Sequence, residues 1–147
     1  MSLLYADSSA LMRAYFADEA EHLELRSMLL EHNEAVVTSE ITRLELASAV
    51  RAAAAAHRIG RPGDLLARID ADLADDGVIG SIDLRPDSVF PVAHRFILEH
   101  RLRPLDAIHL AVCVEDCPSL AGASEIVFVT REGDQVIAAR ALGLQLR

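Results

Sequence analysis

Short apolar runs that alternate with helical stretches restrict the fold of this sequence more than any other feature. The runs are apolar at nearly every position, as in strands that are buried on both faces of a parallel sheet. We predict strands at Leu3–Ala6, Ala35–Val37, Val78–Leu84, Ile126–Val129 and Leu144–Leu146. Helices are predicted at Ser8–Phe16, Glu19–His32, Ser39–His57, Pro62–Asp76, Asp87–His100, Pro104–Asp116 and Gly133–Ala141. These patterns predict an α/β fold with a mostly parallel sheet that helices cover on both faces.

The ends of the helices carry specific predictions. Thr38 or Ser39 is expected to cap the helix that follows, because hydroxyl side chains bind free N–H groups at a helix start. Pro91 is expected to lie in the first turn of its helix or to kink it. The segment 117–125 contains Pro118 and Gly122 and is predicted to be a loop.

Length and composition indicate one folded domain over residues 1–147. The chain is 52% apolar, and its mean hydropathy of +0.24 argues against disorder. No apolar run approaches the roughly 20 residues that span a bilayer. No basic segment precedes an apolar stretch at the N-terminus, so a secretory signal is not expected. We therefore expect a cytoplasmic protein without a membrane partner.

The charge of the chain does not point to a nucleic-acid partner by itself. Its net charge is -9, whereas nucleic-acid binders are commonly basic. An acidic metal pocket would contribute several of these negative charges. All 14 basic residues are Arg, which suits phosphate contacts, although a biased genome composition explains this equally well. Arg43, Arg51 and Arg58 are predicted to share one helix face, as a solvated stripe or as a contact for RNA phosphate or an acidic partner.

Five acidic residues lie in, or just after, segments with the character of a buried core. Asp7 ends the first apolar run, Glu45 and Asp106 lie in helical stretches, and Glu132 and Asp134 follow the last long apolar run. Carboxylates are rarely buried unless they are paired or bind a metal. Ligands of parallel sheets bind beyond the carboxyl ends of strands, where Asp7 and Glu132 are placed. We therefore predict a convergent acidic pocket for a hard cation, Mg²⁺ or Mn²⁺.

Such a pocket indicates a reaction class. Three or four acids can hold one or two cations, which lower the pKa of a bound water and stabilise charge on a phosphate. Hydrolysis of a phosphodiester bond by water is the expected reaction. The chain has no G-x-S-x-G motif that would make Ser9 a nucleophile, so Ser9 is expected to donate to a neighbour or to cap a helix.

Each acid also has a simpler explanation. Asp7 is well placed to cap the following helix, unless Ser8 or Ser9 does so and leaves it free. Glu45 could be an exposed helix charge, and Asp106 could be a first-turn acid that the helix dipole favours.

His109 lies three residues after Asp106 and shares its helix face. We expect a core histidine or a donor to a ligand, because Mg²⁺ prefers oxygen. Zinc is not expected: no H-x-x-x-H pair occurs, and Cys113 and Cys117 lack the C-x-x-C spacing.

Four segments together resemble a known family. Tyr5–Leu11 resembles the opening motif of PIN-domain nucleases, and Thr38–Glu45 resembles their second motif, which ends in an acid. Leu105–Ala111 resembles the third motif. Val127–Asp134, followed by Ala-Leu-Gly-Leu at 141–144, resembles the fourth. Their order and spacing cover essentially the whole chain, and its size is similar to that of VapC toxins of toxin–antitoxin pairs.

The resemblance implies a three-layer α/β/α sandwich and an Mg²⁺- or Mn²⁺-dependent endoribonuclease that acts on RNA such as tRNA or rRNA. It further implies a homodimer, and a protein antitoxin whose C-terminal segment blocks the pocket. Carried over by position, Asp7, Glu45 and Asp106 are metal ligands and catalytic residues. The fourth acid departs from the usual Asp, since Glu132 occupies its position and Asp134 follows two residues later as an alternative.

Two other functions fit part of the pattern. A phosphohydrolase of the haloacid dehalogenase type also begins with an Asp after a strand. That chemistry needs a second Asp two residues later, where this chain has Ser9, and a Lys, which it lacks. A PIN-like binding module without catalysis is the other alternative, in which a partner segment fills the acidic pocket. The Glu at position 132 keeps this alternative open.

Overall fold

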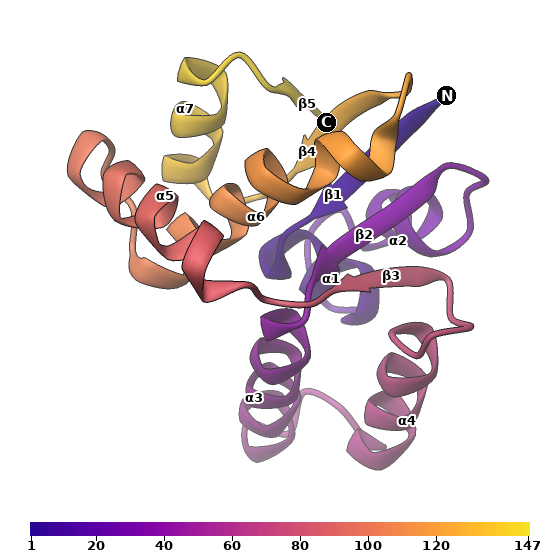
Figure 1. Cartoon of the computed structure of the whole chain (residues 1–147). Coiled ribbons are helices and arrows are strands. Elements are labelled where there is room, and N and C mark those ends of the chain that lie inside the picture. Colours follow the sequence, from indigo (N-terminus) through magenta and orange to yellow (C-terminus); the bar gives the residue numbers. More distant parts are fainter.

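One parallel five-stranded sheet forms the centre of the computed structural model, which describes residues 1–147 (Figure 1). The strand order is β3-β2-β1-β4-β5, and all four pairings are parallel. The strands are β1 Ser2–Ala6, β2 Ala35–Ser39, β3 Ile79–Ile82, β4 Glu125–Val129 and β5 Gln145–Leu146. The predicted α/β fold with a parallel sheet is confirmed.

Helices cover both faces of this sheet. The first layer consists of α1 Ser8–Tyr15, α2 His22–Leu30, α3 Ile41–Ala55 and α4 Pro62–Asp72, and the second of α5 Pro86–Glu99, α6 Pro104–Ala121 and α7 Gly133–Ala141. Successive side chains of β1 alternate between the two layers, so Leu4 packs with the first and Tyr5 with the second. The pair α3 and α4 projects away from the sheet (Figure 1). None of the helices is long and apolar enough to cross a membrane.

Helix α6 is longer than its sequence indicates, and the predicted loop at 117–125 is wrong over its first half. The helix continues through Pro118, which lies in its interior, to Ala121. A proline there removes a hydrogen bond and costs about 3 kcal/mol. The tertiary packing of this part of α6, in which Cys117 is fully buried in the same core cluster as Phe128, helps to offset this cost. The helix ends at Gly122, whose φ of 56° suits glycine.

Three further helix predictions need correction. Thr38 and Ser39 both belong to β2, and Glu40 occupies the cap position of α3. The Ser39 hydroxyl still accepts from the N–H of Ile41, the first residue of α3, over 3.4 Å, whereas Thr38 makes no such bond. The Thr38 hydroxyl instead donates to the carbonyl of Ala6. Pro91 lies inside α5, beyond its first turn.

Helix α2 begins later than predicted, at His22, because Glu21 has a φ of 61° that a helix cannot contain. The Glu21 carboxylate accepts hydrogen bonds from Arg13 and Arg131, which hold the chain at this bend.

The sheet topology creates one position for a ligand. The chain moves from β1 to β2 and β3 on one side, and then returns to place β4 on the other side of β1. Ligands of open α/β sheets bind at such a switch point, beyond the carboxyl ends of the strands. Ala6 pairs with Val129, so the residues after β1 and β4 emerge side by side. Asp7 lies there, and its N–H donates to the carbonyl of Val129 over 3.1 Å.

Burial predicts how the fold responds to truncation. We expect Leu4→Ala to lower the free energy of unfolding by about 2–5 kcal/mol, because Leu4 is fully buried at the middle of the central strand. Leu23→Ala is the matched control: Leu23 is 77% exposed, so its loss should change stability by less than about 0.5 kcal/mol. Urea denaturation of both variants measures the difference. Equal effects would contradict the assignment of the core.

Candidate active site

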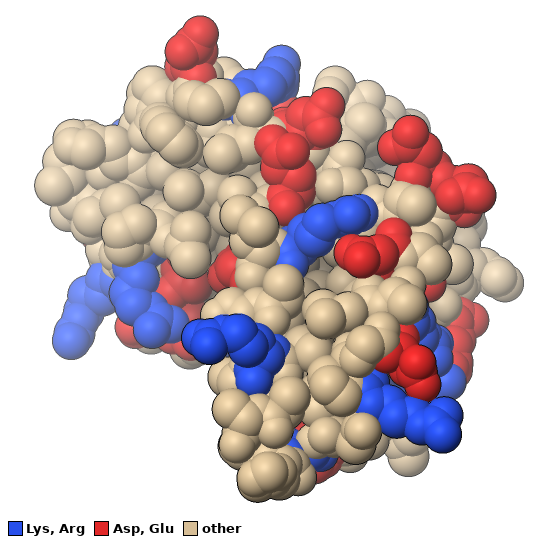
Figure 2. All heavy atoms as spheres, turned by 90° about the horizontal axis from the view of Figure 1, so that it is seen from below, with Lys and Arg blue, Asp and Glu red and all other residues tan.

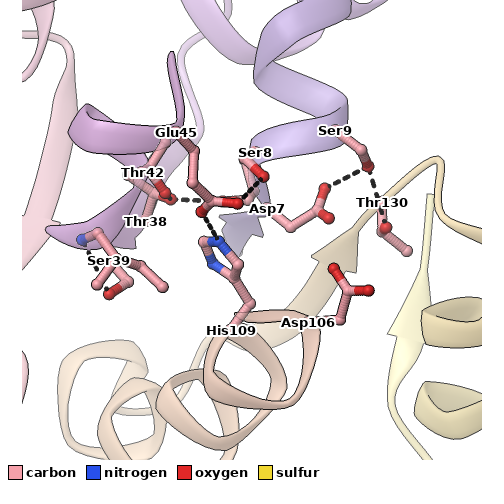
Figure 3. A network of polar contacts seen from close by, with 12 residues as sticks. Asp7, Ser8, Ser9, Thr38, Ser39, Thr42, Glu45, Asp106, His109 and Thr130 are labelled. Atoms are coloured by element: carbon pink, nitrogen blue, oxygen red, sulfur yellow. Dashed lines mark hydrogen bonds and ion pairs between the residues drawn. The ribbon is translucent and has the colours of Figure 1, made fainter. Parts of the chain in front are cut away.

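Asp7 follows β1 directly and caps α1. Its Oδ1 accepts hydrogen bonds from the N–H of Ala10 over 3.1 Å and from the hydroxyl of Ser9 over 2.7 Å. Asp7 itself therefore caps the helix, and Ser9 binds Asp7 instead of replacing it. Both bonds go to one oxygen, and the other oxygen points toward the carboxylate of Asp106 (Figure 3).

The Asp7 carboxylate lies in an unusual environment for a charge, because the residue is only 1% exposed. Burial raises the pKa of Asp7 above its ordinary value of 3.8. The neighbouring His109 and the hydroxyl of Ser9 act in the opposite direction without cancelling this effect. Titratable groups with such raised pKa values are concentrated at functional sites.

Asp106 lies in the first turn of α6 and faces Asp7 across the pocket (Figure 3). Arg103 donates from Nε to Oδ2 of Asp106 over 3.3 Å. The backbone carbonyl of Asp106 accepts from the Gln135 amide over 3.1 Å, and Gln135 in turn accepts from the Thr130 hydroxyl over 2.6 Å. This buried bridge fixes the start of α6 against α7 and the end of β4.

Glu45 projects from α3 next to these two acids and is half-buried. Its Oε2 accepts from the Ser8 hydroxyl over 2.8 Å, and its Oε1 lies 2.6 Å from Nε2 of His109. Burial acts to raise the pKa of Glu45, but the contacts with His109 and Ser8 outweigh it, so the net shift is downward. Glu45 is therefore held as a carboxylate with a fixed direction.

The two candidates for the fourth acid lie in different surroundings. Glu132 has a third of its side chain exposed, and its Oε2 lies 3.9 Å from Nη2 of Arg103, the same guanidinium that contacts Asp106. Asp134 is exposed in the first turn of α7. The structure thus connects Glu132 to Asp106 through Arg103.

Several polar residues of the site gave no clear signal in the sequence. The apolar strand that contains Tyr5 predicts its burial but not the partner of its hydroxyl, and Gln135 is one polar residue inside a short helix. Ser8 could be noticed only as a neighbour of Asp7.

The predicted stripe of Arg43, Arg51 and Arg58 is wrong for Arg58, which lies beyond the end of α3 and binds Asp18. Arg43 and Arg51 both lie in α3, and Arg43 pairs with Asp70.

A family model describes the same part of the chain. The PIN domain model matches residues 4–134. The chain belongs to the PIN domain family. The match contains all five acids predicted from the sequence, from Asp7 to Asp134. A comparison with curated proteins gives no significant match.

Solved structures of the same fold include VapC toxins. VapC20 of Mycobacterium tuberculosis, a toxin that cleaves the sarcin-ricin loop, is 17% identical with a TM-score of 0.68 over 92% of this chain and 94% of that one. VapBC2 of Rickettsia felis, bound to a DNA fragment from its promoter, is 14% identical with a TM-score of 0.62 over 99% and 97%. VapBC-1 of nontypeable Haemophilus influenzae is 12% identical with a TM-score of 0.59 over 99% and 96%. At these identities the likeness establishes the fold.

PIN domains typically use divalent metals, and the side chains of this PIN domain fit one in their chemistry. The donors are carboxylates, which hard cations prefer. Asp7 and Asp106 face one another, each with one oxygen that accepts no protein hydrogen bond within this network. As placed, no three Asp, Glu, His or Cys side chains form a group that could hold an ion. Mg²⁺ is commonly held by one or two carboxylates together with waters, which a facing pair can supply.

The raised pKa of Asp7 predicts that its charge destabilises the metal-free protein. Above pH 3.8 the unfolded chain loses this proton before the folded protein does, so ionisation favours unfolding. Asp7→Asn keeps an oxygen that can cap α1. With EDTA present we expect the variant to melt at a higher temperature than the wild type at pH 7. The gain should shrink to nothing as the pH falls below 3.8. A lower melting temperature at pH 7 would contradict this account of Asp7.

Glu34 provides a control in which the pKa shift, and therefore the expected change in melting temperature, is opposite to that of Asp7. Its bond with Arg147 holds the pKa of Glu34 at about 2, below its ordinary value of 4.5. A lowered pKa stabilises the folded protein above the ordinary value, and this stabilisation is lost as the pH falls toward 2. Glu34→Gln should therefore lower the melting temperature at pH 7 and have little effect near pH 2.

Proposed function

We propose that residues 1–147 form a single nuclease domain that hydrolyses RNA phosphodiester bonds with Mg²⁺ or Mn²⁺. Its role would be that of the toxin in a toxin–antitoxin pair in the cytoplasm. The observation that carries the proposal is the facing pair of carboxylates, Asp7 and Asp106, at the switch point of the sheet, with Glu45 beside them. The PIN family and the fold of ribonuclease toxins support it.

The residues of the pocket have distinct roles in this proposal. Asp7 and Asp106, which face one another, would bind the cation directly, and Glu45 together with Glu132 or Asp134 would complete the site through bound waters. When bound, the cation would supply a polarised water for attack on phosphorus and offset charge on the phosphate. The hydrogen bonds described above hold the carboxylates in fixed directions, so less reorganisation is needed when the charge develops. Arg103, 80% exposed at the mouth, is available to the incoming phosphate.

The charge distribution bears on how RNA would be recognised. Figure 2 shows that basic side chains on the face seen from below are separated by acidic and uncharged surface. A continuous basic stripe that tracks a strand is not visible on this face. We infer recognition by a few Arg contacts and by the shape of a folded RNA, such as a tRNA or rRNA stem-loop.

Apolar surface next to the pocket supports a protein partner. A groove of about 450 Å³ is lined by Met12, Leu44, Ala49, Ala52 and Leu105 and reaches Glu45. We propose that an antitoxin segment lies in this groove and covers the acids. Structures with this fold include toxin–antitoxin complexes from Klebsiella pneumoniae and Neisseria gonorrhoeae.

A second exposed apolar patch lies on α5 and comprises Phe90, Ile97 and Leu98. We propose that this patch contacts another copy of the chain in a homodimer. Burial of such a patch against an identical one is the simplest way to remove it from water.

Removal of one charge at the pocket tests the nuclease. We expect Asp7→Asn to reduce the cleavage of total bacterial RNA by at least about 100-fold, because the variant loses a carboxylate that would hold the cation. The assay compares Mg²⁺, Mn²⁺ and EDTA with purified protein free of any partner. Asp64→Asn, an Asp in the first turn of α4, is the matched control and should cleave like the wild type.

Two outcomes would count against the nuclease. Cleavage by Asp7→Asn at the wild-type rate would show that the activity resides elsewhere. A wild-type protein that binds no divalent cation and cleaves nothing would favour the binding module, in which a partner segment fills the pocket.

The fourth acid can be assigned by a pair of substitutions. Glu132 shares a guanidinium with Asp106, whereas Asp134 is exposed, so we expect Glu132→Gln to reduce cleavage more than Asp134→Asn does. Rates at several Mn²⁺ concentrations measure the difference. A larger loss in Asp134→Asn would reverse the assignment.

A further inference from the structure

A buried pair of polar side chains lies behind Glu45. The hydroxyl of Tyr5 is 2.8 Å from Nδ1 of His109, and both residues are fully buried. The ring of Tyr5 is stacked on Phe128, with centroids 5.6 Å apart and planes within 10°. Buried polar groups are costly without a partner, so each of these two groups requires the other.

The donors and acceptors of this chain of contacts fix the hydrogen on Nε2 of His109. Glu45 is a carboxylate, which only accepts, so His109 donates to it from Nε2 over 2.6 Å. The hydroxyl of Tyr5 can donate or accept, so it partners Nδ1 in the neutral imidazole and in the imidazolium alike.

We propose that Tyr5 and His109 are positioning residues for the metal pocket, in which Tyr5 fixes the ring of His109, and His109 holds the carboxylate of Glu45. Three elements meet in this relay: β1 supplies Tyr5, α6 supplies His109 and α3 supplies Glu45. Ser8 holds the second oxygen of Glu45, so the carboxylate is fixed at both oxygens (Figure 3). The consequence for metal binding rests on the proposed function.

A purely structural role for the pair makes a different prediction. If Tyr5 and His109 only stabilised the core, their loss would lower the melting temperature and leave the metal affinity of the folded protein unchanged. Partners that orient a ligand typically change metal affinity or activity by about 10–100-fold when removed. Metal affinity measured below the melting temperature therefore separates the two roles.

The tautomer can be read directly in the wild-type protein without metal. Long-range ¹H–¹⁵N correlation spectra distinguish the protonated nitrogen of each imidazole, and the signals of His109 are those that disappear in His109→Gln. We expect a hydrogen on Nε2, which donates to Glu45. A hydrogen on Nδ1 alone would overturn the relay, whatever the function of the protein.

Metal affinity is measured by calorimetry with Mn²⁺ on four variants: His109→Leu, His109→Gln, Tyr5→Phe and the control Tyr15→Phe. His109→Leu removes the donor and should weaken binding by about 10–100-fold. His109→Gln retains an N–H donor of similar reach and should restore part of the loss. Tyr5→Phe keeps the stacked ring and removes only the hydroxyl, so it should weaken binding by less than His109→Leu.

Tyr15→Phe is the matched control for Tyr5→Phe, because the Tyr15 hydroxyl also donates from a buried ring, to Asp72 over 2.8 Å. It should bind Mn²⁺ like the wild type. If His109→Leu does not fold, the Mn²⁺ affinities of Tyr5→Phe and Tyr15→Phe alone decide whether the pair positions Glu45 or only stabilises the core.

The outcomes separate the two proposals. A wild type that binds Mn²⁺ together with folded His109 and Tyr5 variants of unchanged affinity would overturn the positioning role and leave the nuclease standing. A wild type that binds no Mn²⁺ would overturn both the metal-dependent nuclease and the positioning of a metal ligand, while the tautomer measurement would still report on the relay itself.

Discussion

The parallel pairing of β1 with β2 and β4 is the constraint on which the site depends. Because all three strands run in the same direction, the segments after them emerge at one edge of the sheet. Asp7 follows β1, α3 with Glu45 begins shortly after β2, and Glu132 follows β4. Asp106 does not follow a strand but lies in the first turn of α6. Its backbone carbonyl accepts a hydrogen bond from the Gln135 amide, which completes the pocket.

The burial of the Asp7 charge in the pocket costs free energy that the surrounding hydrogen bonds only partly offset. Asp7 is buried as an acid with a raised pKa, although the start of α1 and the Ser9 hydroxyl both donate to it. Glu45 lies in the opposite situation, since its donors outweigh burial and lower its pKa. The pKa values of Asp7 and Glu45 are thus shifted in opposite directions within one pocket. The tighter burial of Asp7 makes it the residue that gains most from a cation.

Sequence patterns predicted the layers of this fold well and the contacts of its site poorly. The apolar runs identified all five strands. The signal is strongest in β1, whose five residues are all buried, whereas the edge strands β3 and β5 are partly exposed. The continuation of α6 through Pro118 was missed, since the tertiary packing around Cys117 that helps to offset the proline is not local in sequence. The acids were visible as charges inside apolar segments. The relay from Tyr5 to His109 joins residues 104 positions apart, and no local pattern encodes such a contact.

Arg103 relates the metal site to a protein partner. Its guanidinium contacts both Asp106 and Glu132, but it is 80% exposed. Exposed ion pairs contribute about 0–1 kcal/mol, so this pairing leaves both acids accessible to a stronger ligand. A divalent cation is one such ligand, and an Arg of a partner segment is another, because it can form the same paired contacts. The same weakly held acids would therefore serve catalysis when they bind a cation and inhibition when they bind a partner.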